Sequence, residues 1–278
     1  MRILVTNDDG IDSIGLHRLA SAMCDLQGDH EVVIAAPNTE YSGAGAAIGA
    51  LHLMKPEVHR TSIPGLSGIE TWAIGGPPAL CVMFARLGAL GPTPDLVVSG
   101  INPGANVGRS VYHSGTVGAT LTARNGRISG VAVSQSVAGF GIEGQGWDEM
   151  LADQKWDTAA IVARTFVQAL IDDPPAEPLV ANINVPNLEL DEIKGWRHTE
   201  IGTMPPRSMT RARLEPIAGH DEAYTVEMEW GDELMLPPET DTGAIERDQV
   251  SISFLSRLEH VDRPDVKRPG VALDELIG

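Results

Sequence analysis

The chain has 278 residues, enough for a main domain with an appendage, and its composition is that of an ordinary globular protein. The formal net charge of -18 argues against a nucleic-acid duplex or an anionic membrane as the main partner, because both are polyanions. A strand-like run begins at the N-terminus without a basic leader, and no segment approaches membrane-spanning length, so we expect a cytoplasmic protein.

In the first two thirds of the chain, apolar runs alternate with amphipathic stretches, which predicts βαβ units around a mostly parallel sheet. The predicted strands are Ile3–Thr6, Glu31–Ala36, Leu96–Ser99, Val131–Ser134 and Leu179–Val185. The predicted helices have apolar residues every three or four positions and are Gly15–Met23, Ala79–Leu90, Val117–Asn125 and Trp156–Ile171.

From residue 187 onward the pattern changes and prolines interrupt the chain. Tyr224–Trp230 partly alternates like an exposed strand, Val250–Leu255 is predicted to return as a strand, and Val271–Ile277 is predicted to form a short terminal helix. The segment Thr203–Pro238 has too little apolar patterning to form its own core. We therefore expect an arm that pairs with another subunit.

Two adjacent carboxylates follow the first strand, in the segment Asn7-Asp8-Asp9-Gly10. Ligands of open α/β sheets bind at the carboxyl ends of the strands, and Gly10 allows a sharp turn there. Asp8 and Asp9 repel each other unless a proton or cation is present, and oxygen ligands favour magnesium or manganese. The alternative is a solvated turn, since these residue types are common in turns.

The segment Tyr41–Gly45 follows the second strand and is rich in small residues. Ser42 offers a neutral oxygen, and Gly43 allows close approach of the backbone to a ligand. Together with Gly45 and Gly49, this segment also resembles a weak dinucleotide fingerprint, but its first glycine lies several residues past the strand. A plain flexible loop is the other alternative.

Asn102 lies at the end of the third predicted strand, in Ser99-Gly100-Ile101-Asn102. Its side-chain carbonyl can coordinate a hard cation while its amide donates to an anion, which suits a site where a metal and a phosphate meet. The alternative is a turn in which Asn102 bonds its own backbone.

Small hydroxyl residues lead into the third predicted helix at Ser114-Gly115-Thr116. Free N–H groups at a helix start bind anions without basic residues, which an acidic protein needs in order to hold phosphate. Alternatively, Ser114 or Thr116 serves only as an N-cap. The neighbouring His113 is either a proton donor or a hydrogen-bonded bystander.

These motifs occur in the order and approximate spacing of the survival protein E (SurE) family, and the chain resembles that family over nearly its whole length except the arm. The resemblance extends to four later segments, Asn182–Pro186, Glu192–Gly195, Thr240-Asp241 and Val250–Ile252. It implies a three-layer α/β/α Rossmann-like catalytic core over residues 1–186. It also implies a β-hairpin arm and a swapped C-terminal element over residues 187–278, which make homodimers or homotetramers.

The resemblance further implies a metal-dependent phosphomonoesterase of the 5'/3'-nucleotidase type, acting on nucleoside monophosphates. One divalent cation, magnesium or manganese, would be bound by Asp8, Asp9, Ser42 and Asn102. The phosphate would lie against Ser114, Gly115 and Thr116, and further substrate contacts would come from Ser42, Gly43 and Asn106. The expected catalytic residues are Asp8, Asn102, Ser114 and Thr116.

Departures from the family pattern at Pro77, Leu80 and Thr122 leave these ligands in place but bear on the choice of substrate. The nucleophile is either water or a carboxylate that forms a phosphoenzyme, with Asp8 as the candidate base or nucleophile. Two other functions remain open at this point, a non-catalytic nucleotide sensor on the same fold and a dinucleotide-dependent oxidoreductase.

Overall fold

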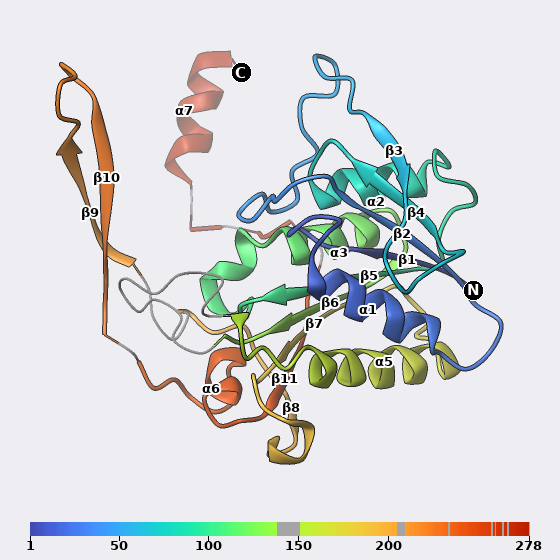
Figure 1. The fold of residues 1–278 in the computed structure, drawn as a ribbon. Coiled ribbons are helices and arrows are strands. Elements are labelled where there is room, and N and C mark those ends of the chain that lie inside the picture. The colour runs from blue at the N-terminus through green and yellow to red at the C-terminus, as the bar shows by residue number, and fades with distance from the viewer. Residues whose placement is uncertain are drawn as a thin grey trace.

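The computed structural model describes residues 1–137, 151–204, 209–232, 234–256, 258, 260–262, 264, 265 and 267–277. Its central sheet consists of β1 (Arg2–Thr6), β2 (Glu31–Pro37), β3 (Val58–Thr61), β4 (Glu70–Ile74), β5 (Leu96–Pro103), β6 (Ser129–Gln135), β7 (Val180–Val185), β8 (Trp196–His198) and β11 (Val250–Phe254). The strand order is β3-β4-β2-β1-β5-β6-β7-β11-β8 (Figure 1). The six strands from β4 to β7 in that order are parallel to one another, whereas β3 and β11 each pair antiparallel with their inner neighbours.

Helices cover both faces of this sheet (Figure 1). One face packs against α1 (Ile14–Cys24) and α5 (Trp156–Asp172), and the other against α2 (Pro78–Arg86) and α3 (Gly115–Asn125). Side chains alternate between the faces along each strand, so the neighbours Ile3 and Leu4 of β1 belong to opposite cores. The prediction of a three-layer α/β/α fold is therefore confirmed.

Each predicted strand and helix of the first two thirds is present, but β3 and β4 are additional. All four residues of β3 are exposed, and β4 has only five residues, so neither shows the apolar run that identifies a buried strand. β5 also continues to Pro103, beyond the predicted end at Ser99, and so carries Asn102 within the sheet. The division into units 1–186 and 187–278 remains a prediction, since β11 joins the same sheet as β7.

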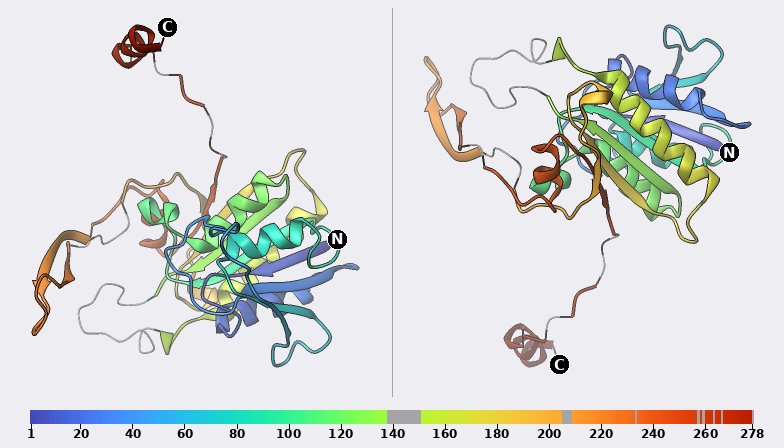
Figure 2. Two further views of the ribbon diagram at one scale, coloured as in Figure 1. Left: turned by 90° about the horizontal axis from the view of Figure 1, so that it is seen from above. Right: turned by 90° about the horizontal axis from the view of Figure 1, so that it is seen from below.

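The expected arm contains an antiparallel hairpin of β9 (Met209–Pro216) and β10 (Tyr224–Trp230), which extends away from the sheet (Figure 2). Residues 205–208 and 233 of the arm lie outside the described residues. The short helix α6 (Asp241–Ile245) follows the arm, and the predicted terminal helix is present as α7 (Arg268–Ile277), also apart from the core (Figure 2). In the described part of the chain, no helix has the length and apolar character needed to cross a membrane.

The hairpin has one apolar and one polar face. Val226 pairs with Leu214 and lies on the same face as Tyr224 and Met228, and all four side chains are more than half exposed. The opposite face carries Thr225 and charged residues. Exposed apolar strands at a sheet edge pair readily with other chains, so this face fits a second copy of the chain, as the sequence analysis predicts.

Replacing Val226 with aspartate places a charge on the apolar face, so we expect Val226→Asp to convert a homo-oligomer into monomers at micromolar concentration in light scattering. The matched control is Thr225→Asp on the polar face, which should leave the oligomer intact. A wild-type chain that is monomeric under these conditions would contradict the assignment of the arm.

Candidate active site

The predicted site residues lie at the carboxyl edge of the parallel strands. Asp8 and Asp9 follow β1, and Asn102 lies near the end of the adjacent β5. The N-terminus of α3 comes to the same point: the Thr116 hydroxyl lies 2.5 Å from Asp8 Oδ1 and 3.3 Å from Asn102 Oδ1. The tertiary structure thus brings together three residues from separate motifs, as expected from the topology of an open sheet.

The Asp8 carboxylate is held by the first turn of α3. Its side chain is almost fully buried, and the main-chain N–H groups of Gly115 and Thr116 interact with it in addition to the Thr116 hydroxyl. A Cβ atom on Gly115 would lie 2.7 Å from Asp8 Cβ and 2.8 Å from Oδ2, so only glycine allows this approach. The positive end of the α3 dipole therefore faces the carboxylate oxygens of Asp8.

The two carboxylates are in an environment that disfavours their charged forms. Burial raises the pKa of Asp8 despite the hydrogen bonds that lower it. Burial, together with the negative charges of Asp8 and Glu40, raises the pKa of Asp9 to about 8. Asp9 Oδ2 is also buried without a hydrogen-bond partner in the described part of the protein. A divalent cation would relieve the repulsion and use the unpaired oxygen, so these residues fit a hard metal ion.

Asp8 and Asp9 have no third charged or imidazole ligand beside them in the described part of the chain. No cluster of three or more His, Cys, Asp or Glu side chains suited to a metal is found within the described ranges. A cation next to Asp8 and Asp9 would need neutral oxygens as well. Asn102 Oδ1 meets this need, since it shares the Thr116 hydroxyl with Asp8.

The loop that contains Ser42 is attached on both sides of this centre. The N–H of Tyr41 donates to the carbonyl of Asp8 (2.7 Å), and the N–H of Gly45 donates to the carbonyl of His113 (2.9 Å). A Cβ atom on Gly118 of α3 would lie 2.1 Å from the Gly45 carbonyl oxygen, so the loop is in close contact with the helix. Ser42 itself is exposed, and it remains a predicted metal ligand.

The neighbouring Gly43 has φ +80°, and a Cβ atom added to it would meet no atom within 4 Å, which fits the expected role of a turn that leaves room for a ligand. The other members of the predicted glycine pattern do not form a tight turn directly after β2, because β2 ends at Pro37. The glycines therefore do not meet the main geometric requirement of a dinucleotide fingerprint, which is a tight turn directly after the strand.

The two hydroxyl residues at the start of α3 have different roles. Ser114 is the N-cap, since its Oγ accepts a hydrogen bond from the N–H of Val117 at 3.1 Å, and its contact with phosphate remains a prediction. The Thr116 hydroxyl donates to Asp8 instead. His113 is exposed and contributes its carbonyl to the loop contact described above, and its role as a proton donor stays untested.

Asn102 and Asn106 also differ. The Asn102 side-chain NH₂ donates to the carbonyl of Gly104 at 2.6 Å, as the alternative of a local turn predicts. Its Oδ1 faces the Thr116 hydroxyl instead. Asn106 is buried, and its side-chain amide donates to Ser134 Oγ at 2.8 Å. Its main-chain N–H donates to Asn184 Oδ1 at 2.7 Å. The donors of Asn106 therefore bond inside the protein, and its contact with substrate remains a prediction.

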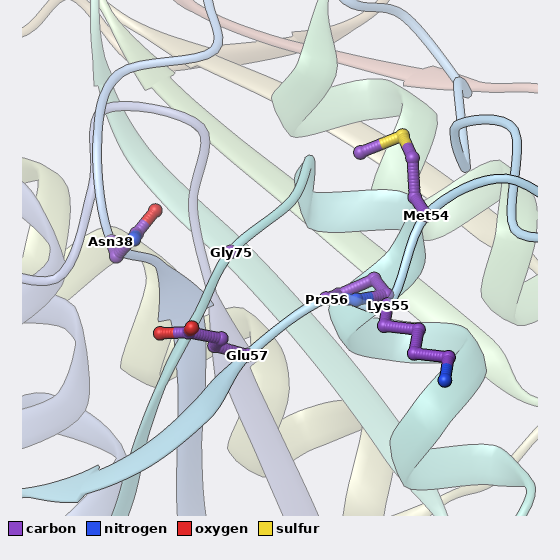
Figure 3. Close-up of a pocket in the computed structure, with 6 residues that line it drawn as sticks. All are labelled: Asn38, Met54, Lys55, Pro56, Glu57 and Gly75. Atoms are coloured by element: carbon purple, nitrogen blue, oxygen red, sulfur yellow. The ribbon is translucent and has the colours of Figure 1, made fainter.

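A hollow of about 380 Å³ lies at the same edge of the sheet, beyond the ends of β2 and β4. Its lining includes Asn38, Met54, Lys55, Glu57 and Gly75 (Figure 3). Figure 3 shows Asn38 and Glu57 on one side of this space, with the Lys55 side chain directed away from both. The sequence analysis did not identify this hollow, because its residues come from two connections, β2–β3 and β4–α2, and match no motif.

Comparison with known proteins identifies the family. Residues 3–207 match the family described as Survival protein SurE. The chain belongs to the SurE family. The 5'/3'-nucleotidase SurE of Erwinia tasmaniensis is 34% identical over 263 residues, which cover 94% of this chain and 91% of that protein. The 5'-nucleotidase SurE of Aeromonas hydrophila is 34% identical over 261 residues, 92% of each chain.

The fold of this SurE-family chain is also similar to a solved structure. The crystal structure of the SurE protein from Aquifex aeolicus superposes with a TM-score of 0.75 at 26% identity and covers 99% of this chain and 100% of that chain. The predicted family and fold class are therefore both confirmed.

The hydrogen bond from the Thr116 hydroxyl to Asp8 provides the best test of whether the start of α3 has a functional or only a structural role. Thr116→Val keeps the shape but removes the donor to Asp8, so we expect kcat/KM for a phosphate ester to fall roughly tenfold or more, with weaker inhibition by vanadate. The matched control is Thr120→Val on the same helix, since the Thr120 hydroxyl donates to the Val117 carbonyl and not to Asp8. Thr116→Val with a lower melting temperature but unaltered vanadate inhibition would show a purely structural role.

Proposed function

We propose that this chain is a divalent-metal-dependent phosphatase that hydrolyses nucleoside monophosphates. The observation that carries the proposal is the pair of adjacent carboxylates, Asp8 and Asp9, which burial holds at raised pKa values and of which Asp8 bonds the first turn of α3. A non-catalytic sensor could hold phosphate on the helix N-terminus alone and would not need two carboxylates that repel each other there. Membership of a family whose named relatives are nucleotidases supports the same conclusion.

The cation would be held by Asp8, Asp9, Ser42 and Asn102, all oxygen donors, with magnesium or manganese as the fitting ions. When bound, such an ion supplies the positive charge that offsets the two carboxylates and polarises a phosphoryl oxygen. The chain itself has no block of Lys or Arg to supply that charge.

The protein side of the reaction follows from the contacts of α3. The N–H groups of Gly115 and Thr116 interact with the Asp8 carboxylate, and the positive end of the α3 dipole would stabilise negative charge on nearby phosphoryl oxygens. The Thr116 hydroxyl, which bonds Oδ1, and these N–H groups fix the orientation of the Asp8 carboxylate. Asp8 would act there as a base toward water or as the nucleophile, with its reactivity raised by burial.

The hollow beyond β2 and β4 has the position expected for the nucleoside. Neighbouring strands are about 4.8 Å apart, so β4 lies roughly 10 Å from β1, within reach of a nucleoside whose phosphate is at Asp8. Glu57 could accept hydrogen bonds from ribose hydroxyls, and the Met54 thioether could pack against a base. Small soluble substrates of this kind also agree with the cytoplasmic location predicted from the sequence.

The metal requirement is tested by measuring p-nitrophenyl phosphate hydrolysis with EDTA and after adding magnesium or manganese. We expect EDTA to abolish turnover and Asp8→Asn to reduce it by at least about 10² to 10³. Full activity after exhaustive chelation would remove the metal from the mechanism.

A second measurement on the same centre does not depend on activity. Asp9→Asn removes the repulsion between two buried carboxylates, so the melting temperature of the EDTA-treated protein should rise. Magnesium should stabilise the wild-type protein but not this variant. Asp12→Asn, an exposed carboxylate on the same connection, is the matched control and should change neither result.

The nucleoside position is tested with Glu57→Ala. This change removes the acceptor for ribose hydroxyls, so KM for a nucleoside monophosphate should rise roughly threefold to tenfold, while KM for p-nitrophenyl phosphate, which has no ribose, stays the same. Glu177→Ala, at an exposed site outside the hollow, serves as control. Equal changes for both substrates would place the nucleoside elsewhere.

A further inference from the structure

Asp241, the first residue of α6, is a buried carboxylate with three main-chain donors. Its side chain is fully buried. Oδ1 accepts hydrogen bonds from the N–H groups of Gly202 and Thr242, and Oδ2 accepts one from the N–H of Gly108, all at 2.8 Å. No cationic side chain in the described ranges pairs with it. The carboxylate thus has its negative charge compensated by N–H groups alone.

The three donors come from functionally different parts of the chain. Gly202 precedes the hairpin arm, and Thr242 follows it, so their bonds to Asp241 close the base of the arm. Gly108 belongs to the connection that leads from Asn102 at the end of β5 to Ser114 at the start of α3. One carboxylate therefore joins the C-terminal region to the segment between two predicted site residues.

The same connection is fixed a second time, two residues earlier. The Asn184 side-chain amide forms a pair of hydrogen bonds with the main chain of Asn106, accepting from its N–H at 2.7 Å and donating to its carbonyl at 3.1 Å. Asn182 donates to the same carbonyl at 2.9 Å. The connection is thus held by β7 at Asn106 and by α6 at Gly108, which leaves little freedom for its course between the two site residues.

We propose that Asp241 is a positioning residue for the phosphatase reaction, which holds the connection between Asn102 and Ser114 so that both ends of it meet at Asp8. The proposal rests on the function proposed above. Asp241 acts through the Gly108 main chain and does not touch the substrate. Displacement of reacting groups by about an ångström is enough to slow an enzyme strongly, so a contact of this kind affects turnover.

The chemistry of the site requires a carboxylate. All three groups around Asp241 are donors, and a carboxylate has only acceptor oxygens. In an Asp241→Asn protein the side chain has the same shape, but its NH₂ group must face at least one of these N–H groups. Asp241→Asn therefore breaks a specific contact without creating a cavity.

The test compares Asp241→Asn with Thr240→Ala, a matched control from the same turn. The Thr240 hydroxyl caps α6 by accepting from the N–H of Gly243 and makes no bond to Gly108, so its loss lowers stability alone. We measure kcat and KM for p-nitrophenyl phosphate well below the melting temperatures, and the affinity for inorganic phosphate with magnesium by calorimetry. We expect Asp241→Asn to lower kcat about tenfold and to weaken phosphate binding, and Thr240→Ala to change neither.

Phosphate affinity separates this proposal from the proposed function. If the wild-type chain binds phosphate but does not hydrolyse the ester, the proposed phosphatase function is wrong. In that case, weaker phosphate binding by Asp241→Asn would still support the positioning role, and unchanged binding would contradict it. Should Asp241→Asn fail to fold, Asp241→Ser, which keeps one acceptor oxygen, is measured by the same criteria. Unchanged kcat and phosphate affinity, or equal losses in Thr240→Ala, would overturn the proposal.

Discussion

The structure depends on the placement of two carboxylates at the buried end of β1. Burial raises the pKa of both carboxyl groups, and the negative charge of Asp8 raises the pKa of Asp9 further. Such a pair costs free energy in the metal-free protein and would be removed by selection for stability alone. A bound cation would offset this unfavourable free energy, and the protein would therefore bind the cation more tightly. The proposed phosphatase reaction uses such a cation together with an anionic substrate.

The surroundings of this pair are built from small residues and main-chain groups. Gly115 allows α3 to approach Asp8, and Gly118 allows the loop that contains Ser42 to approach α3. In the proposed function, the N-terminus of α3 has the role that Arg or Lys has in other phosphate sites. A protein with a net charge of -18 can hold a phosphate in this way, because positive potential is needed only within a few ångströms of the site.

The C-terminal region contributes to the site without entering it. Asp241 bonds the base of the hairpin arm and the connection that ends at Ser114, and β11 extends the catalytic sheet beyond β7. β11, from the second predicted unit, thus lies in the same sheet as the strands of the first. The packing of the arm, where assembly is predicted, is linked to the geometry of the connection near Asp8 through a single side chain.

The sequence by itself determined the α/β architecture and which strand ends bring Asp8 and Asn102 together. Continuous apolar runs such as Ile3–Val5 are typical of parallel strands covered on both faces, and the polar residues directly after them must meet at one edge. Local periodicity could not reveal β3, whose residues are all exposed, because that strand is held by pairing with β4 and not by burial.

Only the tertiary structure decided which polar residues share a function. Ser114 and Thr116 are equivalent as sequence signals, yet one caps a helix and the other bonds Asp8, since their side chains leave the first turn in different directions. Asn106 is bonded to residues of β6 and β7, and Asp241 bonds Gly108 across 133 positions of the chain. Such contacts depend on how distant segments pack, and no local pattern of residue types records that.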